Sequence, residues 1–335
     1  MHIIFIRTFF ILLVTVLCSA CHPDGIFGAK DRAFGIRHDK SLLEYEAVAS
    51  NAAPYHTANY PDFSSVVNFT YSLDGSQNHE YAASGVLVDS LWVLTAGHNF
   101  FTSDDQSSPA LVSGIQVNFG IDPENPDQTR EVAELVFHPT WLDDDDVYGK
   151  ANDLCLVKLK TPVTDLPFAS LSTESNEPLN ATVWYAGYGD YSREPGQDRD
   201  LYSKRHAIEN VLDRVIGDIN SQNQAGETYV GGLVAFDFDA PDSSVNSLGD
   251  DFISEDEPLL GGGSSSPVAR EFEGGTVEGD SGGPLFVQID GRWQVIGILS
   301  GGATEPVRRH RDGDYGDISI FTRVSTAWEW LESVR

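Results

Sequence analysis

The sequence predicts an all-β fold, either a barrel or a sandwich, from three observations. Short runs rich in β-branched and aromatic residues recur along the chain, and Gly, Asp, Asn and Pro separate them. Of the 335 residues, 41% are hydrophobic, which is enough for a sizeable core. Apolar spacing typical of a helix occurs only over residues 325–334 and, more weakly, over residues 205–219.

The expected strands begin near residue 65 and follow one another to residue 324. They cover residues 65–71, 83–88, 92–95, 115–119, 131–137, 154–159, 182–186, 229–238, 284–288, 293–300 and 318–324. Residues 240–275 differ, because they combine acidic residues with the Gly/Ser run 261–266. This composition predicts a mobile acidic surface loop.

The first residues are typical of an export signal. A basic start that ends at Arg7 precedes an apolar run over residues 8–18, which is too short to span a bilayer. Small residues follow up to Ala20, so we expect a signal peptide over residues 1–20 and an N-terminal arm or pro-segment over residues 21–60. An uncleaved membrane anchor is the alternative.

The chain has three cysteines, and two of them belong to this N-terminal segment. Cys21 directly follows the expected cleavage site, as in lipoprotein signals, although Cys18 stands where those signals usually carry Leu. The expected location is therefore secreted, periplasmic or lipid-anchored at the cell surface through Cys21. Cys155 lies in an apolar run, so we expect a buried thiol and no disulfide framework.

The charge of the chain excludes one class of partner. Lys and Arg number 21 against 51 Asp and Glu, which gives a net charge of −30. Such a chain has no general attraction to nucleic acids or anionic membranes. Acidic residues gather at 143–146 and within 240–275, but bare runs lack the interleaved ligands of calcium sites, so we predict solvated loops and no metal.

The strongest chemical motif is Gly279-Asp-Ser-Gly-Gly-Pro284. Glycines around Ser281 allow a tight turn that presents its hydroxyl and lets a substrate approach the backbone. The N–H groups of Gly279 and Ser281 could point to one spot and hold an oxyanion.

A serine hydroxyl needs a base, and two further motifs supply one. His98 ends the apolar run Trp92-Val-Leu-Thr-Ala-Gly-His98, and Asp153 opens the strand expected over residues 154–159. An Asp in contact with His98 would fix the imidazole tautomer. Each motif alone is typical of ordinary strand ends and turns.

Together, in the order His, Asp, Ser, these motifs closely resemble the chymotrypsin/trypsin-like serine peptidases. The resemblance covers about residues 64–335. It also rests on four shorter matches, namely Val136-Phe-His-Pro139, Ala186-Gly-Tyr-Gly189, Gly297-Ile-Leu-Ser-Gly301 and Ile320-Phe-Thr-Arg-Val324.

The resemblance implies two packed six-stranded antiparallel β-barrels with a C-terminal helix. The peptidase domain would cover residues 61–335, with the first barrel at about 61–170 and the second at about 178–324. The helix would cover residues 325–334, and an acidic Gly/Ser-rich insertion would lie within 190–275.

The resemblance also implies the roles of individual residues. Ser281 would be the nucleophile, His98 the general base and then acid, and Asp153 the residue that orients His98. The amides of Gly279 and Ser281 would form the oxyanion hole. Ser300, Gly301 and Gly302 would pair with the substrate backbone as an edge strand. No cofactor and no metal is implied.

The specificity pocket departs from the trypsin pattern. Gly275 stands six residues before Ser281, where trypsin-like members carry Asp, so preference for Arg or Lys is not supported. With Ser319 on a wall, we expect a neutral pocket for small or apolar side chains. Glu278 and Asp317 are the residues that could add negative charge.

In the family, a freed N-terminal Ile or Val places its ammonium beside the Asp that precedes the nucleophile, here Asp280. Ile36 is the nearest candidate, although neither Arg nor Lys directly precedes it. A linker role for Ile36 is the alternative.

We therefore expect an exported serine endopeptidase that acts through an acyl-enzyme on proteins or peptides, as a monomer. The alternative is a non-catalytic binding protein or a latent zymogen on the same fold. An α/β-hydrolase esterase is rejected, because the Gly-x-Ser-x-Gly string is missing and His98 comes first in the chain.

Overall fold

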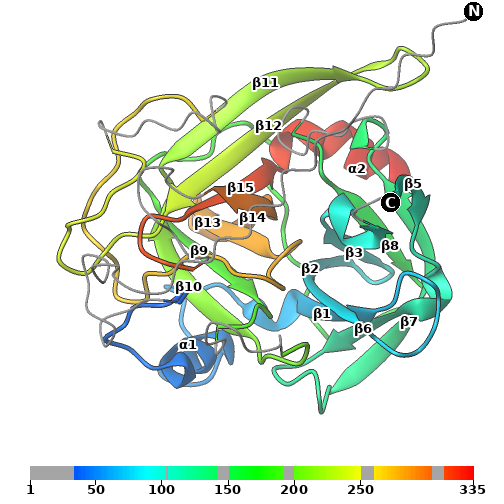
Figure 1. Ribbon diagram of the computed structural model, residues 1–335, viewed down its shortest axis with the longest axis horizontal. Helices are drawn as coiled ribbons and strands as arrows, with labels where there is room; N and C mark the ends of the chain where they lie inside the picture. Colours follow the sequence, from blue (N-terminus) through cyan, green and yellow to red (C-terminus); the bar gives the residue numbers. More distant parts are fainter. Residues whose placement is uncertain (1–33, 103–104, 142–150, 192–199, 250–259, 304–312) are drawn as a thin grey trace, which may run out of the picture.

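The computed structural model describes residues 34–102, 105–141, 151–191, 200–249, 260–303 and 313–335 (Figure 1). Within these ranges the chain forms a closed antiparallel barrel, a second antiparallel sheet and a few short helices. This confirms the mostly-β fold class. The expected signal peptide, Cys21 and the acid run at 143–146 lie outside the described residues.

The first barrel closes in the order β1-β2-β3-β8-β7-β6. Its strands are β1 (Val66–Tyr71), β2 (Tyr81–Asp89), β3 (Trp92–Thr95), β6 (Ile115–Phe119), β7 (Gln128–Phe137) and β8 (Cys155–Leu159). A small ribbon of β4 (Phe101–Thr102) and β5 (Asp105–Pro109) extends from it.

Alternate residues of these strands face two different cores. Val67, Leu87 and Val93 fill the interior of the barrel, whereas their neighbours Val66 and Leu94 join a core shared with the second sheet. Successive side chains of a strand point to opposite faces. Strands such as β1 and β3 are therefore buried on both faces, whereas β7 is partly exposed and carries charged residues.

The second sheet has seven strands, not the six that the sequence analysis expects for a second barrel. Its order is β10-β9-β13-β14-β15-β12-β11. The strands are β9 (Thr182–Gly187), β10 (His206–Val211), β11 (Arg214–Gln222), β12 (Thr228–Asp237), β13 (Pro284–Ile289), β14 (Arg292–Ala303) and β15 (Ile318–Arg323).

The prediction of a helix over residues 205–219 is wrong, because this segment forms β10 and β11. Ile208 is fully buried opposite Tyr185 of β9, and Val215 pairs with Val234 of β12. β-Branched residues that pack against neighbouring strands favour a sheet over a helix. Residues 190–275 thus contribute three strands to the sheet.

The described parts of residues 240–275 form an irregular loop that is mostly exposed over residues 261–268 and is anchored on the sheet by a few contacts. The Arg214 guanidinium donates hydrogen bonds to the carbonyls of Leu248, Gly261 and Ser264 at 2.6–3.4 Å. Leu248 and Leu260 are buried. These contacts hold the loop against the sheet.

Two α-helices lie at the ends of the described chain. α1 (Leu42–Ala49) begins with a capping box between Ser41 and Glu44, a Ser-x-x-Glu signal that the sequence analysis did not use. The expected C-terminal helix is confirmed as a 3-10 turn (Ser325–Ala327) that continues into α2 (Trp328–Val334). Trp330 of α2 packs against His138 with ring centroids 5.0 Å apart.

Candidate active site

His98 lies directly after strand β3, in a 3-10 turn over Gly97–Phe100. The turn packs against the indole of Trp141, which occupies the space that a side chain at Gly97 would need. A Cβ atom on Gly97 would lie 2.8 Å from the Trp141 ring. Gly97 therefore allows the His98 turn to approach Trp141 closely.

Asp153 comes to His98 because β3 and β8 are neighbours in the barrel, with Thr95 opposite Cys155. Asp153 is fully buried. Its Oδ1 accepts the His98 backbone N–H at 2.9 Å, and its Oδ2 lies 2.6 Å from His98 Nδ1. Since a carboxylate only accepts hydrogen bonds, Nδ1 carries the proton and Nε2 is left to act as a base.

The pKa of His98 is raised above its ordinary value of 6.5. Desolvation by the surrounding protein lowers this pKa, but the negative charge of Asp153 and the hydrogen bond to it together outweigh that effect. The imidazole remains 29% exposed, so it is open to solvent and to a ligand.

Ser281 lies on a loop that docks onto the first barrel beside the His98 turn. Its carbonyl accepts hydrogen bonds from Ser84 N–H at 2.9 Å and from the Asn99 amide at 3.1 Å. Gly282 adopts a φ of +87°, and a Cβ atom there would lie 2.0 Å from the Thr95 hydroxyl. Within the described ranges no hydrogen bond joins the Ser281 hydroxyl to His98.

The two expected oxyanion donors are placed by the same loop. Gly279 adopts a φ of +100°, and its carbonyl accepts a hydrogen bond from the Ser84 hydroxyl at 3.0 Å. In the part of the chain that the structure describes, the N–H groups of Gly279 and Ser281 donate no hydrogen bond. They are thus available to a ligand.

Asp280 is fully buried behind this loop, where donors surround its carboxylate. Gly189 N–H donates to Oδ1 at 2.9 Å, while the Tyr191 hydroxyl and Val277 N–H donate to Oδ2 at 2.6 and 2.9 Å. A Cβ atom on Gly189 would lie 2.6 Å from the Asp280 carboxyl carbon, which explains why glycine stands there.

Within the described ranges, Ile36 is not among the hydrogen-bond partners of Asp280. Its backbone forms an isolated bridge with Gly274, and the neighbouring Gly35 donates to Gly313 and accepts from Gly275. The pairing of a freed Ile36 with Asp280 stays a prediction.

Ser300, which the sequence places on the strand expected to pair with the substrate, also contacts Asp153. Its hydroxyl donates to Asp153 Oδ2 at 2.7 Å. The following residues, Gly301 and Gly302, pair with β15 on one side, whereas the pairing of β14 with β13 ends at Ile298.

The residues expected around the specificity pocket lie close together. Ser319 is buried, and its hydroxyl accepts a hydrogen bond from Thr276 N–H at 3.1 Å and lies 2.9 Å from the Thr276 hydroxyl. A Cβ atom on Gly275 would lie 3.3 Å from Phe238, so an aromatic ring stands behind this glycine. Glu278 is exposed, and Asp317 binds Gly313 N–H at 2.6 Å.

Four residues that contact the Ser281 loop or Asp280 were not predicted from the sequence, namely Ser84, Asn99, Tyr191 and His206. A polar residue inside an apolar strand, as with Ser84 in β2, was a usable signal. The other three lie in turns or at a strand end, where local sequence carries no such mark.

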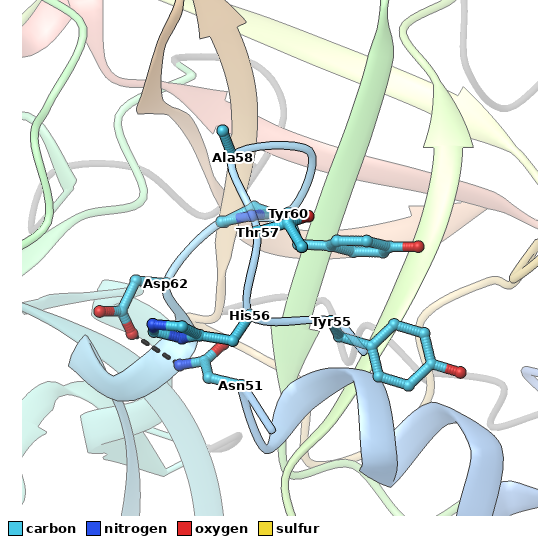
Figure 2. A pocket seen from close by; sticks show the side chains of 8 residues that line it. Asn51, Tyr55, His56, Thr57, Ala58, Tyr60 and Asp62 are labelled. Carbon is cyan, nitrogen blue, oxygen red and sulfur yellow. Dashed lines mark hydrogen bonds between the residues drawn. The ribbon is translucent and has the colours of Figure 1, made fainter. Parts of the chain in front are cut away.

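A separate pocket holds none of the predicted site residues. Figure 2 shows this pocket, which the segment after α1 forms, with a hydrogen bond of 2.6 Å between Asn51 and Asp62. No described helix is long and apolar enough to cross a membrane. No group of three or more His, Cys, Asp or Glu side chains within the described ranges is arranged to hold a metal ion.

Comparisons with known proteins agree with this geometry. The Trypsin family model matches residues 57–226, just over half of the chain, and this match includes His98 and Asp153. The urokinase-type plasminogen activator of Gallus gallus is 24% identical over 264 residues, which are 76% of this chain and 51% of that protein. The chain thus spans about half the length of this curated relative.

Proposed function

The chain belongs to the trypsin family, and on that premise we propose that it is a serine endopeptidase that uses Ser281, His98 and Asp153. One observation carries the proposal: Asp153 binds both the backbone and the ring of His98, beside the loop that holds Ser281. An Asp placed in this way orients the imidazole and stabilises the imidazolium that forms during the reaction.

In the proposed reaction, Ser281 Oγ bonds to the carbonyl carbon of the scissile peptide while His98 Nε2 takes the hydroxyl proton. The N–H groups of Gly279 and Ser281 stabilise the oxyanion. The C–N bond then breaks, the leaving amine takes the proton from His98, and an acyl ester remains on Ser281. Water, deprotonated by His98, hydrolyses this ester and restores the serine hydroxyl.

The proposed substrates are proteins or peptides with a small or apolar side chain before the scissile bond. Ser300, Gly301 and Gly302 would pair with the substrate backbone, and Gly275 and Ser319 would line the side-chain pocket. Two observations support a neutral pocket: Gly275 carries no charge, and the Ser319 hydroxyl is already bonded to Thr276. Glu278 would stand at the exposed rim.

We also propose that the protein is exported and acts as a monomer, with residues 1–20 removed, residues 21–60 as an arm and residues 61–335 as the peptidase domain. The first residues support this, because a basic start, an apolar run and small residues follow one another up to Ala20. Export would leave the protein secreted, periplasmic or anchored through a lipid at Cys21.

The test is covalent labelling of the purified protein with a fluorophosphonate, beside a Ser281→Ala control. Labelling of the wild-type protein alone, with the mass increase on Ser281, is the expected result. A folded wild-type protein that takes no label in any form would identify the alternative, a non-catalytic binding protein on this fold. Cleavage of peptide libraries that vary the residue before the scissile bond then tests the pocket.

A further inference from the structure

Hydrogen bonds hold the loop that carries Ser281 in place although the Gly35–Ile36 peptide bond is intact. Gly35 donates its N–H to Gly313 at 2.6 Å and accepts from Gly275 N–H at 2.9 Å. This segment covers the ring of Tyr191, because a Cβ atom on Gly35 would lie 2.5 Å from that ring. The uncut segment is therefore part of the packing around Tyr191.

Tyr191 connects this packing to Asp280. Its hydroxyl lies 2.6 Å from Asp280 Oδ2 and 3.1 Å from the Gly275 carbonyl. Both atoms accept hydrogen bonds, so the single hydroxyl proton is directed to the closer, charged acceptor, the carboxylate.

His206 faces the other oxygen of the same carboxylate. Its Nε2 lies 3.4 Å from Asp280 Oδ1, and its Nδ1 lies 3.3 Å from the Lys204 carbonyl. Among the described residues, His206 Nε2 makes no hydrogen bond, so the ring supports the carboxylate through its proximity and packing. The ring is buried and packs on Tyr191 with centroids 3.7 Å apart.

The same segment also orients the peptide that carries an oxyanion donor. Asp190 N–H donates to the Glu278 carbonyl at 3.0 Å. In a planar trans peptide the carbonyl and the N–H point in opposite directions, so this bond turns Gly279 N–H away from Asp190. Residues 189–191 thus fix both Asp280 and the Glu278–Gly279 peptide.

We propose that Tyr191 and His206 are positioning residues that hold Asp280, and with it the oxyanion loop, in the uncut chain, so that no freed N-terminus is needed. The inference rests on the proposed peptidase activity. It makes the uncut protein competent for catalysis, with a tyrosine hydroxyl and an imidazole where a new ammonium group would otherwise be required.

The first experiment compares two forms of the wild-type protein. One is the protein with the Gly35–Ile36 bond shown intact by mass spectrometry, and the other begins at Ile36 after cleavage at an introduced site. We expect the uncut form to react with a fluorophosphonate at Ser281, at a rate within about twofold of the cut form. Labelling of the cut form alone would overturn the inference but leave the peptidase function standing. If neither form reacts, the proposed function itself fails, and the inference fails with it.

The second experiment removes the hydroxyl group of one tyrosine at a time. Tyr191→Phe should lower kcat on a peptide substrate about tenfold with KM little changed, because a hydrogen bond to a charged group behind the oxyanion loop is lost. The matched control is Tyr188→Phe. This variant removes a buried hydroxyl that donates to the Gly120 carbonyl at 2.5 Å and not to Asp280. Equal kcat in the two variants, with similar thermal stability, would overturn the role of Tyr191.

Discussion

The Ser300 hydroxyl lies 2.7 Å from Asp153 Oδ2, the same oxygen that lies 2.6 Å from His98 Nδ1. The Asp153 carboxylate therefore accepts three hydrogen bonds, one from the second sheet and two from the His98 turn. This contact ties the orientation of His98 to the packing of β14 against the first barrel.

Replacement of Ser300 with Ala should lower kcat/KM about tenfold, because a buried carboxylate loses a charge-assisted hydrogen bond. The less stabilised carboxylate should also bind the His98 proton more strongly, which moves the acidic limb of the pH profile to higher pH. Steady-state kinetics from pH 5 to 9 measure both effects.

The control for this variant is Ser65→Ala, because Ser65 is buried and its hydroxyl has no hydrogen-bond partner among the described residues. It should leave kcat/KM and the pH profile unchanged. A Ser300→Ala profile that coincides with the wild type would contradict the role of the Ser300–Asp153 contact.

Activity should rise with pH through a midpoint above 6.5, since His98 must be neutral to accept a proton and its pKa is raised. The same raised pKa makes the folded state bind this proton more tightly than the unfolded state. Its contribution to stability is therefore present below pH 6.5 and is lost as the pH rises through the folded-state pKa. A flat rate profile from pH 5 to 8 would exclude His98 as the base.

His138 should make the protein sensitive to acid. Burial lowers the pKa of His138 to about 3. Between pH 6.5 and pH 3, His138 therefore binds a proton in the unfolded chain but not in the folded protein. Stability is then lost as the pH falls from 6.5 towards 3, by at most about 1.4 kcal/mol per pH unit. Urea unfolding of His138→Asn at pH 7 and pH 4 should show a smaller difference than the wild type, whereas exposed His56→Asn should keep the wild-type difference.

A cluster of buried carboxyls should make the protein sensitive to alkali. Asp213, Asp237, Asp239 and Glu273 are each at most 5% exposed. Burial and the charges of Asp237 and Asp213 raise the pKa of Asp239 to about 9. The folded state thus keeps a proton that the unfolded chain releases near pH 4, and this stabilisation is lost as the pH rises towards 9.

Asp239→Asn should therefore raise the free energy of unfolding at pH 9 by at least about 1 kcal/mol, because the variant has no proton to lose. At pH 5 its stability should be close to that of the wild type. Asp242→Asn is the matched control, since the Asp242 carboxylate accepts from Ser244 N–H and its pKa is lowered. An equal alkaline gain in both variants would show that net charge, not the buried cluster, is responsible.

Gly97→Ala should destabilise the protein by about 1–3 kcal/mol and lower kcat, because the added methyl group overlaps the Trp141 indole and shifts the His98 turn. The double variant Gly97→Ala/Trp141→Phe should recover part of both losses. Gly262→Ala, where the new methyl group meets nothing within 4 Å, should be neutral. Additive effects in the double variant would argue against a direct overlap.

The sequence was sufficient for those features that depend on local pattern. Short runs rich in β-branched and aromatic residues predicted the strands of the first barrel, and in strands such as β3 alternate residues fill two cores. The same local signal failed at residues 205–219. There Val211, Leu212, Val215 and Ile216 fit a helical spacing, and only the neighbouring strands β9 and β12 make this segment a sheet.

By itself, the sequence determined the order of the chemical motifs and the residue types they contain, since Gly279–Gly283, His98 and Asp153 are each recognisable from their immediate neighbours. Only the tertiary structure decided which distant groups support them: Ser300 on Asp153, Ser84 and Asn99 on the Ser281 loop, and Tyr191 with His206 on Asp280. These partners come from strands and turns up to 195 residues away in the chain. A hydrogen bond requires proximity in space, and a local hydrophobic pattern specifies which face of a strand is buried but not which polar group will lie opposite it.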